Sequence, residues 1–475
     1  MYHIYILNAP IFNVIHYNKI GNKLLKMIQL PYTIITFNVI RCKYRINSIT
    51  KYVANIMKQR FYSLDVFRGL TVALMILVNT PGSWSYIYPP LEHAEWHGLT
   101  ATDLVFPFFL FAVGNAMAFV MPKLQAQGSV VFWNKVLKRT VIIFVIGFLL
   151  NWFPFVKWSG NSLIPIPWQG TDATGNPYGI RIMGVLQRIA LCYLVASIIA
   201  YYTKPKYTIY ITIILLLGYW GICYWGNTQY PYSITGWVGN PLDHSILGVH
   251  HVYFREGLAL KSIEEIGNNI LNSTTKIDGK DVSILFDPEG ILSTIAAIAQ
   301  VVIGYIIGGF IIRKGNTRNT VVQLLTIGLV LGIIGTIWHQ FFPVNKKIWT
   351  SSYTILTSGM ATLCIAMLIY AFEIKKLPTV YGKFFDAFGK NPLFIFVLSG
   401  ALPRLLTLIK VYSTDPTHVG TVSRVVNPLK WFYENVISPI STNHKLTSFV
   451  YALIMILFYW LIAYLMDKKK IYVKV

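Results

Sequence analysis

Apolar runs of about twenty residues recur along most of this 475-residue chain. A helix needs about twenty apolar residues to cross the hydrocarbon core of a bilayer, so each run predicts a membrane-spanning helix. Only helices and closed barrels satisfy their backbone hydrogen bonds in lipid, and these runs are long enough for helices. The predicted fold is therefore all-α, a polytopic transmembrane helical bundle of about ten spans. We place these spans at 65–80, 101–121, 136–154, 182–203, 207–226, 291–313, 320–341, 350–372, 388–409 and 447–466.

Lysine and arginine side chains gather in every second connection between these spans. Cytoplasmic loops of membrane proteins are enriched in these residues, so the alternation predicts that both termini are cytoplasmic. The remaining connections face the other side and hold most of the acidic residues. The basic positions are Lys58, Arg60, Lys135, Lys138, Arg139, Lys204, Lys206, Arg313, Lys314, Arg318, Lys375, Lys376, Lys383, Lys468, Lys469 and Lys470.

The composition supports an integral membrane protein that contacts the lipid bilayer directly. Charged residues make up 12% of the chain, whereas soluble domains carry about 25%. The net charge of +23 is compatible with nucleic-acid binding, but the cations lie between apolar runs and follow the membrane pattern. We therefore expect no nucleic-acid partner. The four cysteines are isolated and offer neither a disulfide framework nor the paired spacing of a metal site.

Residues 1–56 differ from the rest of the chain because their apolar stretches are short and interrupted. We interpret them as an extension of doubtful order, and Met57 is an alternative start of translation. Residues 57–475 are expected to form one domain. Its longest connection, about 227–290, predicts a small non-cytoplasmic insert with amphipathic character near 258–271. Residues 1–40 lack the apolar core and small-residue cleavage site of a signal peptide.

The connection between the first two spans concentrates side chains that can do chemistry. Either these residues form a site, or the aromatic rings are an interfacial belt and the charges only solvate the loop. His93 and His97 are four apart, as in a paired metal site, yet no third ligand stands near them, so we expect no metal. The residues concerned are Asn79, Trp84, Glu92, His93, Glu95, Trp96, His97 and Asp103.

A lone histidine can act as a general base if a neighbour holds its tautomer. The sequence offers three carboxylates for this role: Glu92, Glu95 and Asp103. For Asp103 itself we favour a cap at the head of the second span over a hydrogen bond to His93 or His97. The amide of Asn79 could stabilise a developing oxyanion. This set fits acyl transfer to an amine, in which the histidine either accepts a proton or carries the acyl group itself.

Charges inside the spans are costly, so each is a functional hypothesis. Asp65 and Arg68 are three apart and favour a local structural pair. Arg181 and Arg188 should share one face of the fourth span, about 10 Å apart along its axis. For Arg188, a buried ion pair and a ligand phosphate are equally plausible partners. Asp287 opens an Asp-Pro-Glu-Gly string that could simply cap the sixth span.

Several strings in the chain resemble the heparan-α-glucosaminide N-acetyltransferase family of transmembrane acetyltransferases. They are SLDVFRGLTVALMILVN, HAEWHGLTATDLVFPFFLFAVG, RIMGVLQRIALCY, DPEGILSTI, PVNKKIWTSSY and GKNPLF. The resemblance implies that acetyl from cytosolic acetyl-CoA reaches the amino group of a terminal glucosamine across the membrane. It also implies that the active histidine is His93 and that its supporting asparagine is Asn79. Asp103 is then the third catalytic candidate.

This resemblance, combined with the charge pattern, places a donor and an acceptor at opposite ends of the bundle. We expect Arg68, Lys383 and Arg188 to contact the CoA phosphates, with the pantetheine arm running between helices toward His93. The acceptor, an amino sugar or glycan end, would meet Glu92, Trp96 and His97. These expectations fit a bacterial inner-membrane enzyme with its histidine on the periplasmic side, with homo-oligomerisation left open. The alternative is a multi-span transporter of a sugar or sugar derivative.

Overall fold

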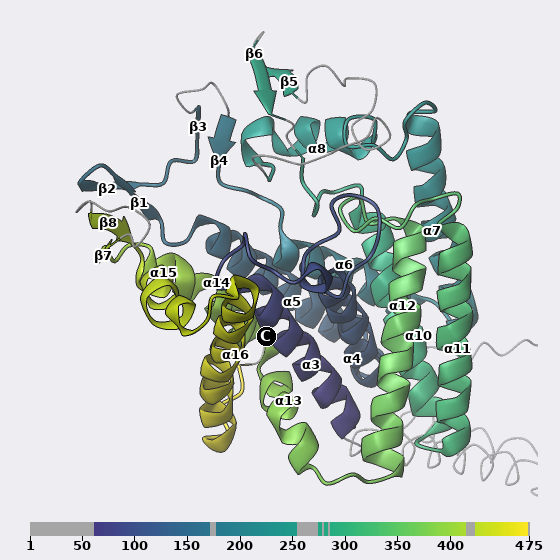
Figure 1. Ribbon diagram of the computed structural model, residues 1–475. Coiled ribbons are helices and arrows are strands. Elements are labelled where there is room, and N and C mark those ends of the chain that lie inside the picture. The colour runs from purple at the N-terminus through teal and green to yellow at the C-terminus, as the bar shows by residue number, and fades with distance from the viewer. Residues whose placement is uncertain are drawn as a thin grey trace, which may run out of the picture.

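The computed structural model describes residues 61–171, 177–253, 274–277, 280–283, 286–414 and 423–473 (Figure 1). The expected N-terminal extension and the amphipathic stretch near 258–271 lie outside these residues. Long helices account for most of the described chain. They are α3 (Tyr62–Asn79), α4 (Val105–Gln127), α5 (Ser129–Trp152), α6 (Val185–Tyr202), α7 (Pro205–Gly226), α10 (Thr294–Lys314), α11 (Arg318–Trp338), α12 (Ser351–Leu368), α14 (Pro392–Leu406) and α16 (His444–Lys468).

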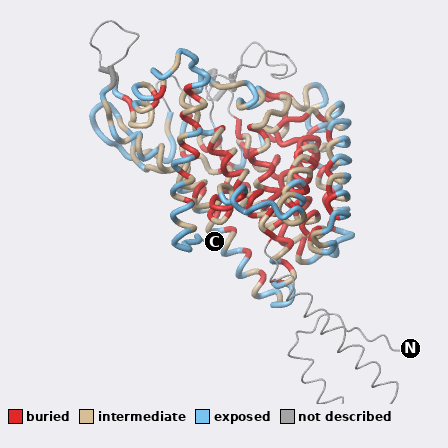
Figure 2. Tube along the Cα trace, turned by 60° about the horizontal axis from the view of Figure 1, so that its bottom comes forward, coloured by how far each residue is buried: buried red, intermediate tan, exposed pale blue. Residues whose placement is uncertain are grey.

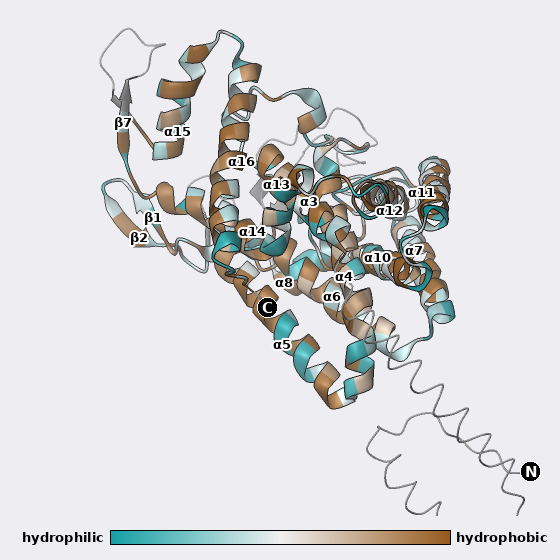
Figure 3. Cartoon of the chain, turned by 90° about the horizontal axis from the view of Figure 1, so that it is seen from below, coloured by the Kyte–Doolittle hydropathy of each residue, from teal (hydrophilic) through white to brown (hydrophobic). Residues whose placement is uncertain are grey.

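Within the described residues, eight helices are long and apolar enough to cross a membrane. Two of the ten predicted spans fall outside this set: α5 carries three basic residues in its first half, and α14 has 15 residues. The helical membrane bundle is thus confirmed, whereas the number of spans and the cytoplasmic termini stay predictions. Apolar residues dominate the helices when they are seen from below (Figure 3). Large apolar side chains are exposed on α7 and α11, among them Ile213, Ile214, Leu217, Val322, Leu329 and Val330.

The late starts of the ninth and the fourth predicted spans change the interpretation of their residues. The apolar stretch at 388–409 is divided, because α13 (Val380–Lys390) ends before Asn391 and α14 starts at Pro392. Proline lacks a backbone N–H and suits the first turn of a helix, so it starts a new helix at this point. The fourth span starts at Val185. Arg181 therefore precedes the helix and does not share a helical face with Arg188.

The connections also contain strands, which the all-α prediction did not include. The part of the chain that the structure describes holds four hairpins, and each is a two-stranded antiparallel pair. Together with the short helix α8 (Gly239–Leu247), several of them lie at the upper end of the bundle in Figure 1. The strands are β1 (Val156–Ser159) with β2 (Ser162–Pro165), β3 (Gln169–Thr171) with β4 (Pro177–Gly179), β5 (Thr274–Ile277) with β6 (Lys280–Ser283), and β7 (Val411–Thr414) with β8 (Ser423–Val426).

The core of the bundle depends on close approach between α4 and α10. A Cβ atom added at Gly114 would lie 1.9 Å from the carbonyl oxygen of Val301, and one added at Gly304 would lie 2.3 Å from that of Phe111. Small residues let the backbones of two membrane helices approach closely enough to pack against each other. Figure 2 shows the result, with buried residues concentrated in the interior of the bundle. The candidate site begins at the N-terminal end of α4, one of the two helices in this closely packed pair.

Candidate active site

His93 lies in the loop that joins α3 to α4, and its ring is held by a carboxylate. The ring Nδ1 is 2.6 Å from Oδ1 of Asp103. The Asp103 side chain is 1% exposed, whereas that of His93 is 35% exposed. A carboxylate can only accept, so Nδ1 carries the proton and the lone pair is on Nε2. Of the three carboxylates that the sequence offered, Asp103 is the one that contacts this ring.

Asp103 also fastens the loop to the head of α4. Its Oδ2 accepts hydrogen bonds from the backbone N–H groups of Ala94 (3.1 Å) and Thr100 (3.2 Å), and from the Thr100 hydroxyl (3.1 Å). None of these donors belongs to the first turn of α4, so the carboxylate does not serve as the helix cap considered above. The backbone carbonyl of Asp103 in turn accepts from the Tyr353 hydroxyl (2.6 Å). The histidine is therefore positioned by a buried, anchored group.

A lysine from a distant connection completes this arrangement. Lys346 Nζ lies 3.1 Å from Nδ1 and 3.4 Å from Nε2 of His93, and 3.5 Å from Oδ1 of Asp103. Its loop is tied to the histidine loop, because the N–H of Gly98 donates to the carbonyl of Val344 (2.8 Å). The imidazole of His93, the carboxylate of Asp103 and the ammonium group of Lys346 thus form one cluster.

The surroundings of His93 favour its neutral form. Partial burial lowers the pKa of the imidazole from its ordinary value of 6.5, and the ammonium groups of Lys346 and Lys347 act in the same direction. The hydrogen bond and the charge of Asp103 oppose these effects without reversing them. At neutral pH the ring is therefore an unprotonated base with Nε2 available.

A cavity of about 290 Å³ opens beside this cluster. Its lining combines polar groups, among them His93, with apolar side chains from α3, α4, α6 and α14. Asn79 lies at the end of α3 and lines the same cavity, so the structure brings it together with His93 and Asp103. The polar lining comprises Asn79, His93, Asp103, Arg181, Glu289, Lys346 and Lys347. The apolar lining includes Met75, Val78, Val105, Phe106, Phe109, Val185 and Phe396.

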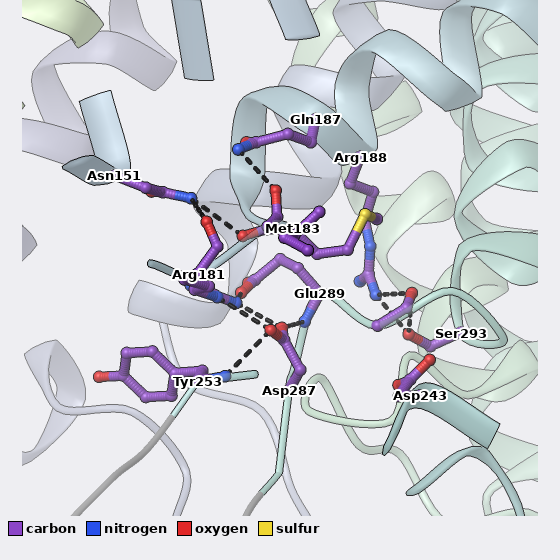
Figure 4. Close-up of polar contacts among 12 residues, drawn as sticks. Asn151, Arg181, Met183, Gln187, Arg188, Asp243, Tyr253, Asp287, Glu289 and Ser293 are labelled. Carbon is purple, nitrogen blue, oxygen red and sulfur yellow. Dashed lines mark hydrogen bonds and ion pairs between the residues drawn. The ribbon is translucent and has the colours of Figure 1, made fainter. Parts of the chain in front are cut away.

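The Asp-Pro-Glu-Gly string forms an ion-pair cluster at the cavity wall (Figure 4). Arg181 Nε donates to Oδ2 of Asp287 (2.9 Å), and its Nη2 donates to Asp287 Oδ1 and to Glu289. Burial alone would lower the pKa of Arg181, but these two carboxylates raise it above its ordinary value. Because α10 begins only at Thr294, Asp287 does not cap it as the sequence suggested. The string instead anchors the segment between β4 and α6 to the segment before α10.

Arg188 lies in the first turn of α6, at the end of the bundle that carries His93, whereas Arg68 and Lys383 lie at the opposite end. Its contact with CoA phosphates stays a prediction. Its side chain is fully buried, and Nη2 donates to the Gly290 carbonyl (3.0 Å) and to the Ser293 hydroxyl. Neither of the two partners we considered, a carboxylate in a direct pair or a ligand phosphate, accounts for these contacts (Figure 4).

The remaining residues that we predicted for the site lie at opposite ends of the helical bundle. Trp96 is buried, lines the cavity, and donates through Nε1 to the Tyr232 carbonyl (2.9 Å). Glu92 is exposed and His97 lies 3.4 Å from the Asn345 amide, and neither lines the cavity. At the opposite end, Arg68 pairs with Asp65 on α3, and Lys383 is exposed on α13, which packs against α3. The Asp65–Arg68 pair confirms the local contact expected from their spacing.

Comparisons with known proteins agree with the motifs. Residues 60–159 match the family model described as a domain of unknown function, DUF5009. The human heparan-alpha-glucosaminide N-acetyltransferase is 26% identical, over 71% of this chain and 52% of its own length. The resemblance seen in the sequence is confirmed. The mouse N-acetyltransferase is 25% identical, over 71% of this chain and 53% of its own length. The chain thus spans about half the length of the curated N-acetyltransferases it matches.

Sequence reasoning missed Lys346 as a residue of the site. The string that contains it was noted for its resemblance to these N-acetyltransferases, but no role was assigned to its lysines. One indication was present: Lys346 and Lys347 lie in a connection that the charge pattern places on the non-cytoplasmic side, where basic residues are depleted. Two cations that depart from the charge pattern in this way need an explanation, and the contact with His93 supplies one.

Proposed function

We propose that this chain is a transmembrane N-acetyltransferase that moves acetyl from acetyl-CoA to the amino group of a glucosamine-type sugar. The observation that carries the proposal is the His93–Asp103 pair at the edge of a cavity that Asn79 also lines. The similarity to N-acetyltransferases supports the reaction class. We place the reaction on the non-cytoplasmic side of a bacterial inner membrane, with both termini in the cytoplasm.

In the proposed reaction, the sugar nitrogen attacks the thioester carbon. The carbonyl π electrons move to oxygen, and Nε2 of His93 takes the proton that the attacking nitrogen loses. When the carbonyl re-forms, the carbon–sulfur bond breaks, and the thiolate of CoA takes the proton from the imidazolium. Asp103 keeps the ring in the required tautomer and stabilises its cationic form. A variant in which Nε2 first accepts the acetyl group uses the same residues.

The cavity suits two reactants of different character. Its polar part, with Asn79, Glu289 and Lys346, offers donors and acceptors for a sugar. Its apolar part, between α3, α4, α6 and α14, suits the acyl end of the donor. We propose that Arg68 and Lys383, on neighbouring helices at the opposite end, contact the phosphates of CoA. Charge-assisted hydrogen bonds from such cations are the usual means of holding phosphate.

A thiol-release assay tests the proposal. The purified protein, supplied with acetyl-CoA and glucosamine, should release free CoA and form N-acetylglucosamine. His93→Ala should reduce the rate by roughly 10²–10⁴-fold, the range for loss of a general base. His444→Ala is the matched control, because His444 is exposed on the same side of the bundle and lies outside the cavity. It should retain the wild-type rate.

The same experiment separates the enzyme from a transporter. A transporter of a sugar would move glucosamine into proteoliposomes without consuming acetyl-CoA, and His93→Ala would leave thiol release at the background level of the wild-type protein. That result would refute the proposed acetyl transfer.

A further inference from the structure

Lys346 is one of the polar groups that line the cavity, but the bond changes of the proposed reaction assign it no role. Its Nζ is nearly equidistant from the two ring nitrogens of His93, at 3.1 and 3.4 Å. Nδ1 already donates to Asp103, so it cannot accept a proton from the ammonium group. The ammonium group of Lys346 therefore lies beside both ring nitrogens of His93, with its N–H donors 3.4 Å from Nε2, where bonds change in the proposed reaction.

The fold holds Lys346 in this position through its neighbour Asn345. Asn345 is fully buried. The side-chain oxygen of Asn345 accepts a hydrogen bond from the backbone N–H of Ile348 (3.0 Å), and the backbone N–H of Asn345 donates to the Thr350 hydroxyl (3.1 Å). Thr350 is also fully buried and caps α12 through the N–H of Tyr353. The lysine thus projects from a fastened turn, with 21% of its side chain exposed.

We propose that Lys346 is a catalytic residue that binds the oxyanion formed when the acetyl group is transferred beside His93. This inference rests on the proposed function and deepens it. Oxyanion donors act when they lie about 3 Å from the oxygen that becomes negative. An ammonium group 3.4 Å from Nε2 meets this requirement for a carbonyl whose carbon reacts next to Nε2.

The electrons balance without a further reactant. As the nucleophile bonds to the carbonyl carbon, the π pair moves to oxygen and is stabilised by the Lys346 ammonium group. As the pair returns, the carbon–sulfur bond breaks and the thiolate leaves. Lys346 keeps its proton throughout, and the transferred proton passes through His93. If Nε2 attacks first, the same oxyanion forms as the thiolate leaves. It forms again when the sugar nitrogen attacks the acetyl group on Nε2; the carbon–Nε2 bond then breaks, and the freed Nε2 takes the proton of the sugar nitrogen.

Two other residues are weaker candidates for this role. Asn79 lines the cavity, but the structure records no contact between its side chain and His93 among the described residues. Lys347 also lines the cavity, but its ammonium group donates to the Glu95 carbonyl and lies 5.7 Å from the Trp96 ring centre. Lys346 is the cation whose distances place it at the reacting nitrogen.

The test compares Lys346→Met and Lys346→Arg with a control, Lys445→Met, which removes an exposed cation on the same side of the bundle. Lys346→Met should lower kcat about 10²–10³-fold, as expected for loss of an oxyanion donor. The KM for acetyl-CoA should change far less, because the charge develops only in the transition state. Lys346→Arg should recover part of the rate, and the control should match the wild type.

A structural role would give a different result. If Lys346 only neutralised Asp103, Lys346→Met would lower the melting temperature and Lys346→Arg would restore it, while kcat of the folded fraction stayed near the wild-type value. That outcome overturns the inference. The acid limb of the kcat/KM profile provides a second readout: it should move to higher pH in Lys346→Met, because a cation beside the ring has been removed.

The donor p-nitrophenyl acetate separates this inference from the proposed function. If the wild-type protein releases no thiol from acetyl-CoA but hydrolyses this ester in a His93-dependent way, the proposed function fails and the Lys346 comparison still applies. Equal ester hydrolysis by the wild type and Lys346→Met overturns the oxyanion role. Absence of any His93-dependent turnover of either donor overturns both.

Discussion

Replacing Asp103 by asparagine removes the charge that orients His93 while keeping the size of the side chain. In the wild type, the carboxylate is 1% exposed and lies 2.6 Å from Nδ1. In the transition state it faces an imidazolium, so the variant loses one partner of a partly buried ion pair. Loss of one partner of a buried ion pair costs about 3–5 kcal/mol, and here that cost is added to the activation free energy. Since about 1.4 kcal/mol changes a rate tenfold, kcat should fall by roughly 10²–10⁴-fold.

The assay measures CoA release at saturating acetyl-CoA and glucosamine, with thermal unfolding recorded on the same preparation. Thr100→Val is the control for the second role of Asp103, the fastening of the loop. This change removes the hydroxyl that donates to Asp103 (3.1 Å) and to the Glu92 carbonyl (2.6 Å), but leaves the contact with His93. It should cost about 1–3 kcal/mol of stability while most of kcat remains.

One result would refute this reasoning. If folded Asp103→Asn retained kcat within about threefold of the wild type, a change of less than 1 kcal/mol, orientation by this carboxylate would not contribute to catalysis. Asp103 would then be a loop anchor alone, and the two variants would differ only in melting temperature.

Three further outcomes follow from the structure. The kcat/KM of the wild type should fall on acidification with an apparent pKa below 6.5, because partial burial lowers the pKa of His93; a limb above that value in the pH–rate profile would contradict this. In a thermal unfolding assay, Gly114→Ala should destabilise the protein by about 1–3 kcal/mol, because the new Cβ would lie 1.9 Å from the Val301 carbonyl oxygen. The control, Gly218→Ala, should be neutral, because a Cβ at that position meets nothing within 4 Å. Burial raises the pKa of Asp243 from 3.8 to about 7, so the folded state favours the protonated carboxyl, and this contribution is complete below pH 3.8 and lost as the pH rises through about 7. Asp243→Asn should therefore raise the melting temperature at pH 8, with a gain that disappears near pH 4.

The membrane spans could be predicted because bilayer-length apolar runs are a local property of the chain. The hairpins could not, because strands of three or four residues, such as Val156–Ser159, leave no pattern long enough to distinguish them from a loop. The division at Asn391 shows an intermediate case. Its Asn-Pro pair is a recognised break, but the hydropathy of the flanking residues concealed it.

The candidate site likewise contains residues that the sequence could identify and a choice that it could not make. His93 and Asn79 were identified through the resemblance of the motifs around them. Asn79 is at the end of the first predicted span and His93 is in the connection that follows it, so the sequence already placed both on the same side of the membrane. The choice among Glu92, Glu95 and Asp103 was beyond the sequence, since all three lie within ten residues of the ring. Only the path of the loop decides which carboxylate reaches Nδ1.

The order of residues alone determined that this chain is a helical membrane protein with titratable and aromatic side chains gathered in the connection between its first two predicted spans. Hydropathy and motif content are carried by neighbouring residues and need no folding to be seen. Tertiary structure decided which groups meet. Lys346 and His93 are 253 residues apart and come within 3.1 Å, and Arg181 pairs with Asp287 across 106 residues. Such contacts depend on how the helices pack, and packing is a property of the whole bundle.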